Sequence, residues 1–223
     1  MHKPKTGIMA TGGIDSTVLL YKYRHLNPTP ITVDYGHHAF QKQVEMLDYH
    51  IKKLQLPELQ IIDIKYGDWQ KTKGLFEPGY KPNENNPLED WDELRYKDFF
   101  IEGRNMIMVA YVMAFCSAHK LDELLAGYLY TETEWNNRRT YKLMTGDNSP
   151  QFVDMMNLLS TVGLSHQIRF RAPYYEQRLS KQDVYNTGIE LDVNFDKTHS
   201  CYFVPACGKC DNCLLRKNMM EKA

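Results

Sequence analysis

The 223-residue sequence lacks the features that would direct it to a membrane, to export or to a nucleic acid. It has no run of about 20 uncharged apolar residues, the length that a membrane-spanning helix needs. Its N-terminus, MHKPKTGIMA, carries lysines but no apolar signal-peptide core, so we expect a cytoplasmic protein with no membrane partner. The net charge of −1 provides no general positive field, and a nucleic acid is therefore not expected as a direct partner.

Apolar residues make up 43% of the chain, enough for one large domain. Strand-like and helix-like segments alternate, which predicts an α/β fold with a doubly wound parallel sheet. We expect residues 1–195 to form this domain and residues 196–223 to form a cysteine-bearing segment packed on it. The expected strands span 5–10, 31–36, 59–66, 123–129 and 166–173, the helices 16–26, 40–54, 104–119, 149–163 and one beginning at Ser180, and the polar stretch 79–92 is a long loop.

A glycine-rich stretch, IMATGGIDSTVLL from Ile8 to Leu20, joins the first expected strand to the first helix. Paired glycines let the backbone approach an anion, and a helix N-terminus favours negative charge. Asp15 would repel phosphates unless Mg²⁺ lies between them or it caps the loop. The loop is not a Walker loop, because no lysine follows the glycines. The stretch predicts a phosphate-binding loop, with an ordinary strand–helix turn as the alternative.

Four cysteines crowd into the C-terminal tail, in the spacing Cys-x5-Cys-x2-Cys-x2-Cys: Cys201, Cys207, Cys210 and Cys213. In a reducing compartment such a set predicts metal ligands rather than disulfides. Four thiolates complete a closed tetrahedral zinc shell, so we expect a structural zinc ion. An iron–sulfur cluster is the alternative.

The loop TGGIDST resembles the SGGxDS pyrophosphate loop of the PP-loop (HUP-like) ATP pyrophosphatases, with Thr11 in place of the first serine. Four other stretches narrow the resemblance to the 7-cyano-7-deazaguanine synthase (QueC) family. They are DYGH (Asp34 to His37), EGRN (Glu102 to Asn105), RLSKQDV, and the tail THSCY…CGKCDNCLLRK. Three of these differ from the family pattern, with His37 replacing a glutamine, Glu102 replacing a proline and His199 replacing a tryptophan.

This resemblance implies an ATP-dependent C–N ligase that adenylates 7-carboxy-7-deazaguanine and, with ammonia, converts it to the nitrile 7-cyano-7-deazaguanine. Mg²⁺ would accompany ATP, zinc would be structural, and the protein would be a homodimer. It implies roles in catalysis for Asp15, Ser16, Arg104 and Lys181. The implied ATP-binding residues are Ala10, Thr11, Gly12, Gly13, Ile14, Asp15, Ser16, Thr17, Asp34, Tyr35 and Asn105. Arg104 could instead cap or pair at the start of its helix, and Lys181 could instead be a solvated lysine in the first turn of its helix.

The substrate pocket is where the sequence departs from the family. The family element YPDCR is absent after Gly127, where the chain reads GYLYTETEWNNRRTYK. Glu132 or Glu134 is a candidate for the guanine-like edge and Trp135 for stacking, while Arg138 or Arg139 would hold a carboxylate unless they form a solvated face. The altered pocket leaves two alternatives for the product, an amide or transfer to another amine. Separate alternatives for the class of protein are a tRNA-modifying PP-loop thiolase and a non-catalytic nucleotide sensor.

Overall fold

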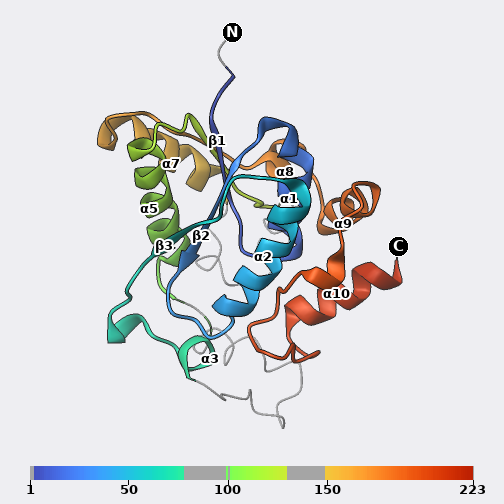
Figure 1. Ribbon diagram of the computed structural model, residues 1–223. Helices are drawn as coiled ribbons and strands as arrows, with labels where there is room; N and C mark the ends of the chain where they lie inside the picture. The colour runs from blue at the N-terminus through green and yellow to red at the C-terminus, as the bar shows by residue number, and fades with distance from the viewer. Residues whose placement is uncertain (1–2, 78–98, 100, 130–148, 223) are drawn as a thin grey trace.

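The computed structural model describes residues 3–77, 99, 101–129 and 149–222 (Figure 1). Five parallel strands form one sheet in the order β3-β2-β1-β4-β5. Their bounds are β1 Thr6–Met9, β2 Thr29–Asp34, β3 Gln60–Asp63, β4 Glu123–Leu125 and β5 Arg169–Arg171. The predicted doubly wound α/β class is confirmed.

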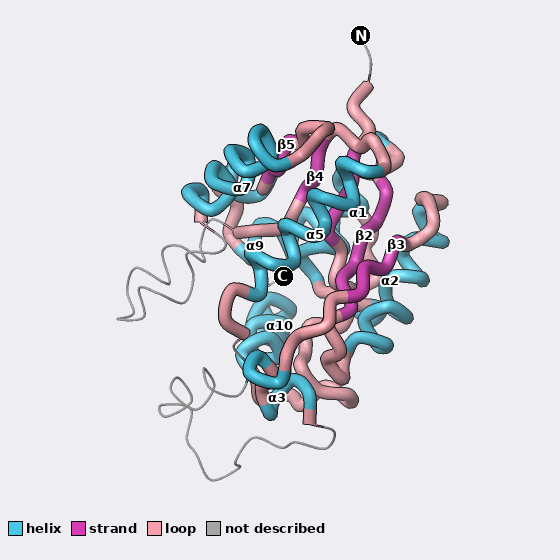
Figure 2. Tube along the Cα trace, turned by 90° about the vertical axis from the view of Figure 1, so that its left-hand side faces the viewer, coloured by secondary structure: helices cyan, strands magenta, loops and turns pink. Residues whose placement is uncertain are grey.

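Helices cover both faces of this sheet, and the strands lie between them (Figure 2). Neighbouring strand residues point to opposite faces, as Leu124 and Leu125 show by packing into two different cores. One core lies under α5 and α7, and the other lies under α1, α2 and α9. The helices are α1 Ile14–Tyr23, α2 Phe40–Leu54, α3 Lys73–Phe76, α5 Arg104–Ala118, α7 Pro150–Gly163, α8 Pro173–Glu176, α9 Lys181–Glu190 and α10 Asp211–Glu221.

The observed elements differ from the sequence expectations mainly at their ends. Helix α1 begins at Ile14, two residues before the expected start, and tightens into a 3₁₀ turn at Arg24–Leu26. The expected strand 123–129 stops at Leu125, because its ladders with β1 and β5 hold only three residues. The expected Ser180 cap is confirmed, since Ser180 and Asp183 form a reciprocal capping box. The expected loop 79–92 lies outside the described residues.

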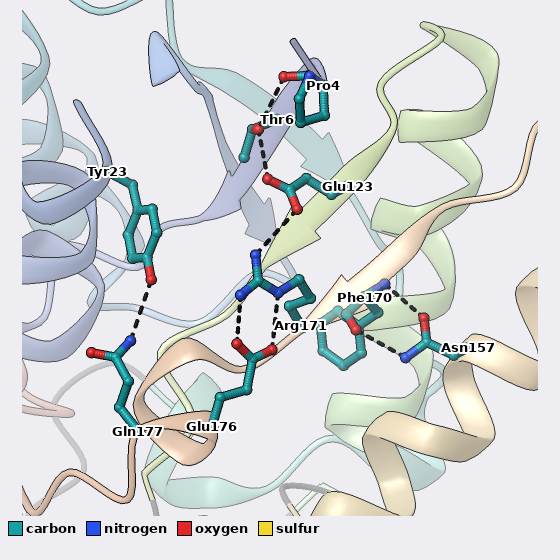
Figure 3. A network of polar contacts seen from close by, with 9 residues as sticks. All are labelled: Pro4, Thr6, Tyr23, Glu123, Asn157, Phe170, Arg171, Glu176 and Gln177. Carbon is teal, nitrogen blue, oxygen red and sulfur yellow. Dashed lines mark hydrogen bonds and ion pairs between the residues drawn. The ribbon is translucent and has the colours of Figure 1, made fainter. Parts of the chain in front are cut away.

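A buried carboxylate ties three strands together near the start of β4 (Figure 3). Glu123 is only 6% exposed; it accepts a hydrogen bond from the Thr6 hydroxyl at 2.9 Å and faces Arg171 at 3.4 Å. Arg171 also pairs with Glu176, at 2.9 Å from Nε, and this pairing raises the pKa of the guanidinium. The charge of Glu123 is therefore compensated inside the fold.

The edge strand β5 is closed by a side chain from α7 (Figure 3). The Asn157 amide donates to the carbonyl of Phe170 and accepts from its N–H, at 2.9 and 2.8 Å. It thereby occupies the backbone groups that would otherwise recruit another strand. Among the described helices, none is long and apolar enough to cross a membrane.

Candidate active site and metal centre

The glycine loop lies at the carboxyl end of β1, the central strand of the sheet. The chain fills the β2–β3 side first and then crosses to β4 and β5, so β1 borders the point where the strand order reverses. Open α/β sheets bind ligands at such a point. Gly127, just beyond β4, approaches the loop so closely that a Cβ there would lie 3.4 Å from the carbonyl carbon of Asp15. The loop is thus bordered by the neighbouring strand's end.

Hydrogen bonds within the loop leave backbone donors available. The Ser16 hydroxyl accepts from the Thr11 N–H at 3.0 Å and lies 3.2 Å from the Thr11 hydroxyl, while Gly12 takes a left-handed conformation with φ +71°. Within the described part of the chain, the N–H groups of Asp15 and Ser16 have no hydrogen-bond acceptor. They belong to the first turn of α1, where orphan N–H groups and the helix dipole attract an anion.

Asp15 forms the charged centre of the loop. Its Oδ2 accepts from the Lys181 ammonium at 2.8 Å, and both side chains are about a quarter exposed, at 25% and 26%. Within the described residues, its buried Oδ1 and the buried Thr17 hydroxyl have no hydrogen-bond partner. The Tyr174 hydroxyl donates to the Asp15 carbonyl at 2.9 Å, which fixes the backbone from beneath. Buried polar atoms without partners commonly mark a place where a ligand, ion or water completes the site.

A second group of predicted residues gathers at the end of β2. Asp34 accepts a hydrogen bond from the Gly36 N–H at 2.8 Å. The Tyr35 ring stacks on His37, with 4.2 Å between their centroids. Burial raises the pKa of Tyr35, and the Arg104 guanidinium beside it opposes that rise. Arg104, the first residue of α5, is therefore brought to the same edge of the sheet, and the half-buried Asn105 follows it in the helix.

The β1 and β2 groups are joined through Gln43 of α2. The side-chain oxygen of Gln43 lies 3.1 Å from His37 Nε2, and its backbone oxygen would lie 2.6 Å from a Cβ at Gly12. Only glycine fits that approach. Burial lowers the pKa of His37 to about 4, so the imidazole is neutral at physiological pH. Loop and β2 end form one continuous, partly buried polar edge.

The four tail cysteines converge as their spacing predicts. Their sulfur atoms all lie within 4.8 Å of one another, and the Cys201 sulfur lies 3.6 Å from that of Cys207 and 3.8 Å from that of Cys210. Cys201 Sγ also accepts N–H bonds from Phe203 and Cys207 at 3.4 and 3.3 Å. The hydrogen bond with Cys210 and those N–H donors lower the pKa of the Cys201 thiol to about 4. This donor set fits a metal ion.

The structure also contains site residues that the sequence interpretation missed, namely Gln43, Tyr174 and Ser200. Ser200 Oγ accepts from the Ile14 N–H at 3.3 Å, and the His199 N–H donates to the Gly12 carbonyl at 2.7 Å. The only signal for Ser200 was that it directly precedes Cys201, a predicted metal ligand. The proposed pocket residues Glu132, Glu134, Trp135, Arg138 and Arg139 lie outside the described residues.

A parallel sheet with a glycine loop at its central strand and a four-cysteine cluster beside that loop defines a PP-loop-type α/β protein. The chain matches the family model described as queuosine biosynthesis protein QueC over residues 5–223, and it therefore belongs to the QueC family. This family identity makes the protein an enzyme, since the curated relatives are named as synthases.

Two such relatives are named 7-cyano-7-deazaguanine synthase. The one from Methanococcus maripaludis is 25% identical over 96% of this chain and 92% of its own, and the one from Porphyromonas gingivalis is 25% identical over 97% and 92%. A solved structure, U34-tRNA thiolase NcsA from Methanococcus maripaludis with its [4Fe-4S] cluster, shares the fold with a TM-score of 0.55 at 12% identity, covering 100% of this chain and 68% of that one.

Proposed function

We propose that this enzyme uses ATP and ammonia to convert 7-carboxy-7-deazaguanine to 7-cyano-7-deazaguanine. Family membership over residues 5–223 supports the substrate class. The observation that carries the ATP-dependent chemistry is the glycine loop, where Asp15 and Lys181 meet beside first-turn N–H groups that lack an acceptor. The proposal needs no side-chain nucleophile, because positioning and charge stabilisation suffice for adenylation.

The proposed reaction has two activation steps. A carboxylate oxygen of the substrate attacks the α-phosphorus of ATP, the bond to the β-phosphate breaks, and pyrophosphate leaves. Ammonia then adds to the acyl carbon and AMP departs, which leaves an amide after loss of a proton. A second ATP adenylates the amide oxygen in the same manner, and loss of AMP and protons from nitrogen forms the carbon–nitrogen triple bond.

The described residues divide these tasks. The N–H groups of Asp15 and Ser16 would bind the departing pyrophosphate, and the Lys181 ammonium would neutralise its charge. Arg104, the first residue of α5, would face the α-phosphate, and the Tyr35 ring beside it would pack near the nucleotide. Asp15 Oδ1, which has no partner among the described residues, is the oxygen offered to Mg²⁺, whose bound charge would lower the repulsion among the phosphates.

For the cysteine cluster we propose a structural zinc ion. Zn–S bonds near 2.3 Å in a tetrahedron place sulfurs about 3.8 Å apart, and two of the observed separations are 3.6 and 3.8 Å. An iron–sulfur cube between the same thiolates would hold them farther apart than a single ion does. The spacing favours zinc, and the free thiols fit a reducing compartment such as the cytoplasm.

Transfer of the adenylated substrate to a different amine is the second candidate, because the sequence after Gly127 lacks the family's YPDCR element. One mass-resolved experiment separates the two. The protein is incubated with 7-carboxy-7-deazaguanine, ATP and Mg²⁺, with and without ammonium, and AMP, pyrophosphate and product masses are followed. A nitrile that forms only with ammonium supports the synthase. AMP release without nitrile favours an amide product or another acceptor, and no AMP in any arm refutes adenylation of this substrate.

We also propose that the protein is a homodimer that associates through α5 and α7, which contact each other on one face of the sheet (Figure 1). Helix α5 has no charged side chain after Arg104, and α7 has only Asp154. Helices that are apolar on all sides are normally buried. The large apolar residues that are more than half exposed here are Met106, Tyr111, Met155, Leu158, Leu159 and Val162.

A second copy suits this face because two nearly uncharged surfaces meet across a two-fold axis without like-charge repulsion. Helix α5 is about 22 Å long, and two adjacent helices are about 20 Å wide. Their flat footprint is on the order of 400 Å², and the ridged accessible surface is larger. The flat footprint alone is about half of the roughly 800 Å² per partner of a standard interface.

A further inference from the structure

Helix α1 begins on a residue that provides no cap. Gly13 is its N-cap, with φ −79° and ψ 170°, and it has no side chain to accept a first-turn N–H. The hydroxyl of Ser16 cannot serve, because it folds back to the Thr11 N–H at 3.0 Å. The acceptor for the Ile14 N–H is Ser200 Oγ, 186 residues away in the sequence, at 3.3 Å. The tail thus supplies the cap that the loop lacks.

The space around Gly13 explains this arrangement. A Cβ at residue 13 would lie 3.2 Å from Ser200 Oγ but 4.0 Å from Ser200 Cβ. The first distance is tighter than an ordinary contact, and the second is comfortable. A capping side chain at position 13 and the hydroxyl of residue 200 would therefore compete for one place.

The tail is itself fixed on both sides of Ser200. Arg216 of α10 donates to the Thr198 hydroxyl at 2.7 Å, and Cys201 enters the sulfur cluster. Between these two anchors, the buried His199 donates its N–H to the Gly12 carbonyl at 2.7 Å. The backbone of Gln43 in α2 also packs closely against Gly12. The loop is therefore held between α2 and a segment that ends at a metal ligand.

We propose that Ser200 is a positioning residue for the anion loop, through which the metal-bound tail sets the loop's shape. The identity of the anion rests on the proposed function, whereas the mechanical link does not. Because coupling between two sites is reciprocal, an anion in the loop should tighten metal binding by the cysteines, and metal should tighten anion binding by the same factor. Removing the Ser200 hydroxyl should weaken this link, while the bond from the His199 N–H to the Gly12 carbonyl and all four thiolates stay in place.

The link between the tail and the loop is tested first in the absence of any anionic ligand. Hydrogen exchange of the loop amides is compared between the zinc-loaded and EDTA-stripped protein, for wild type, Ser200→Ala and Ser200→Thr. Zinc should protect the Ile14 amide, which donates to Ser200 Oγ, in wild type and in the threonine variant, and Ser200→Ala should lose most of that protection. Equal protection in the alanine variant, with an unchanged melting temperature, would overturn the proposal.

Pyrophosphate with Mg²⁺ is the second probe, measured by calorimetry and by its effect on zinc affinity in competition with a chromophoric chelator. Loss of a helix cap changes an equilibrium constant about fivefold, so Ser200→Ala should bind pyrophosphate about fivefold more weakly. Bound pyrophosphate should also no longer raise the zinc affinity of this variant. If wild type binds no pyrophosphate, the proposed function fails, while the exchange result still decides the role of Ser200.

A double-mutant cycle guards against misfolding of the alanine variant. Gly13→Ala crowds the Ser200 hydroxyl from the other side, and Ser200→Ala removes the crowded atom. The double variant should therefore protect its loop amides better than the sum of the single effects predicts. Additive effects would show that the two residues do not share this contact, and the proposal would fall.

Discussion

Replacing Leu158 by glutamate should dissociate the proposed dimer. Leu158 is 56% exposed in the isolated chain and lies near the middle of the exposed apolar residues of α7. Burying a whole leucine is worth roughly 1.5–3 kcal/mol, so covering its exposed half contributes about 1 kcal/mol. The two-fold axis doubles this to about 2 kcal/mol. The variant also places two glutamates in an apolar contact, and a total loss above about 3 kcal/mol weakens the dimer more than 100-fold.

The assay is sedimentation velocity across a hundredfold range of protein concentration. Wild type should sediment as twice the 26.2 kDa chain mass, and Leu158→Glu as the single chain. Ile189→Glu is the matched control, because Ile189 is 50% exposed on α9, on the opposite face of the sheet. Val162→Glu repeats the test at the most exposed of the apolar residues of α7.

Mixing chains of opposite charge sharpens the result. Leu158→Glu and Leu158→Lys chains, each monomeric alone, should form a mixed dimer if the two copies of Leu158 face each other. A wild type that is monomeric at every concentration would refute the reasoning. So would a Leu158→Glu dimer as tight as wild type, since the interface would then lie elsewhere.

Three further outcomes are expected. Lys181→Met should lower kcat/KM for AMP formation about 100-fold. Its unfolding free energy should change little, because the ion pair with Asp15 is partly exposed. The control Lys22→Met, at the far end of α1, should leave the rate unchanged. The pKa of His37 is about 4 in the folded protein and 6.5 in the unfolded chain, so falling pH favours the unfolded state. His37→Gln should therefore recover about 2 kcal/mol of the unfolding free energy that wild type loses between pH 8 and pH 5. An identical pH dependence of the unfolding free energy in urea denaturation would contradict this. Chelation of the metal should lower the melting temperature by several degrees and expose α10 to proteolysis, and an unchanged melting curve would mean that the cluster holds no ion.

The sequence predicted most of what depends on short-range pattern. Alternating apolar segments revealed the α/β class, because strand and helix periods differ whatever the tertiary contacts. The spacing of Cys207, Cys210 and Cys213 predicted a shared site, because a turn with two intervening residues brings thiols together locally. Strand ends were predicted less well. A strand such as β4 ends where its neighbours stop pairing with it, and the residues of the strand itself do not specify that point.

Which residues meet across long distances was decided only by the folded chain. Lys181 reaches Asp15 because α9 packs against α1, and a sequence separation of 166 residues carries no trace of that contact. The same holds for Ser200, which was overlooked beside a conspicuous cysteine although it caps the helix that begins the site. By itself the sequence determined the fold class, the glycine-rich loop and the thiol cluster, because each follows from local spacing and chemistry. Tertiary packing alone joined loop and cluster, since hydrogen bonds between distant segments form only after the cores have fixed both backbones.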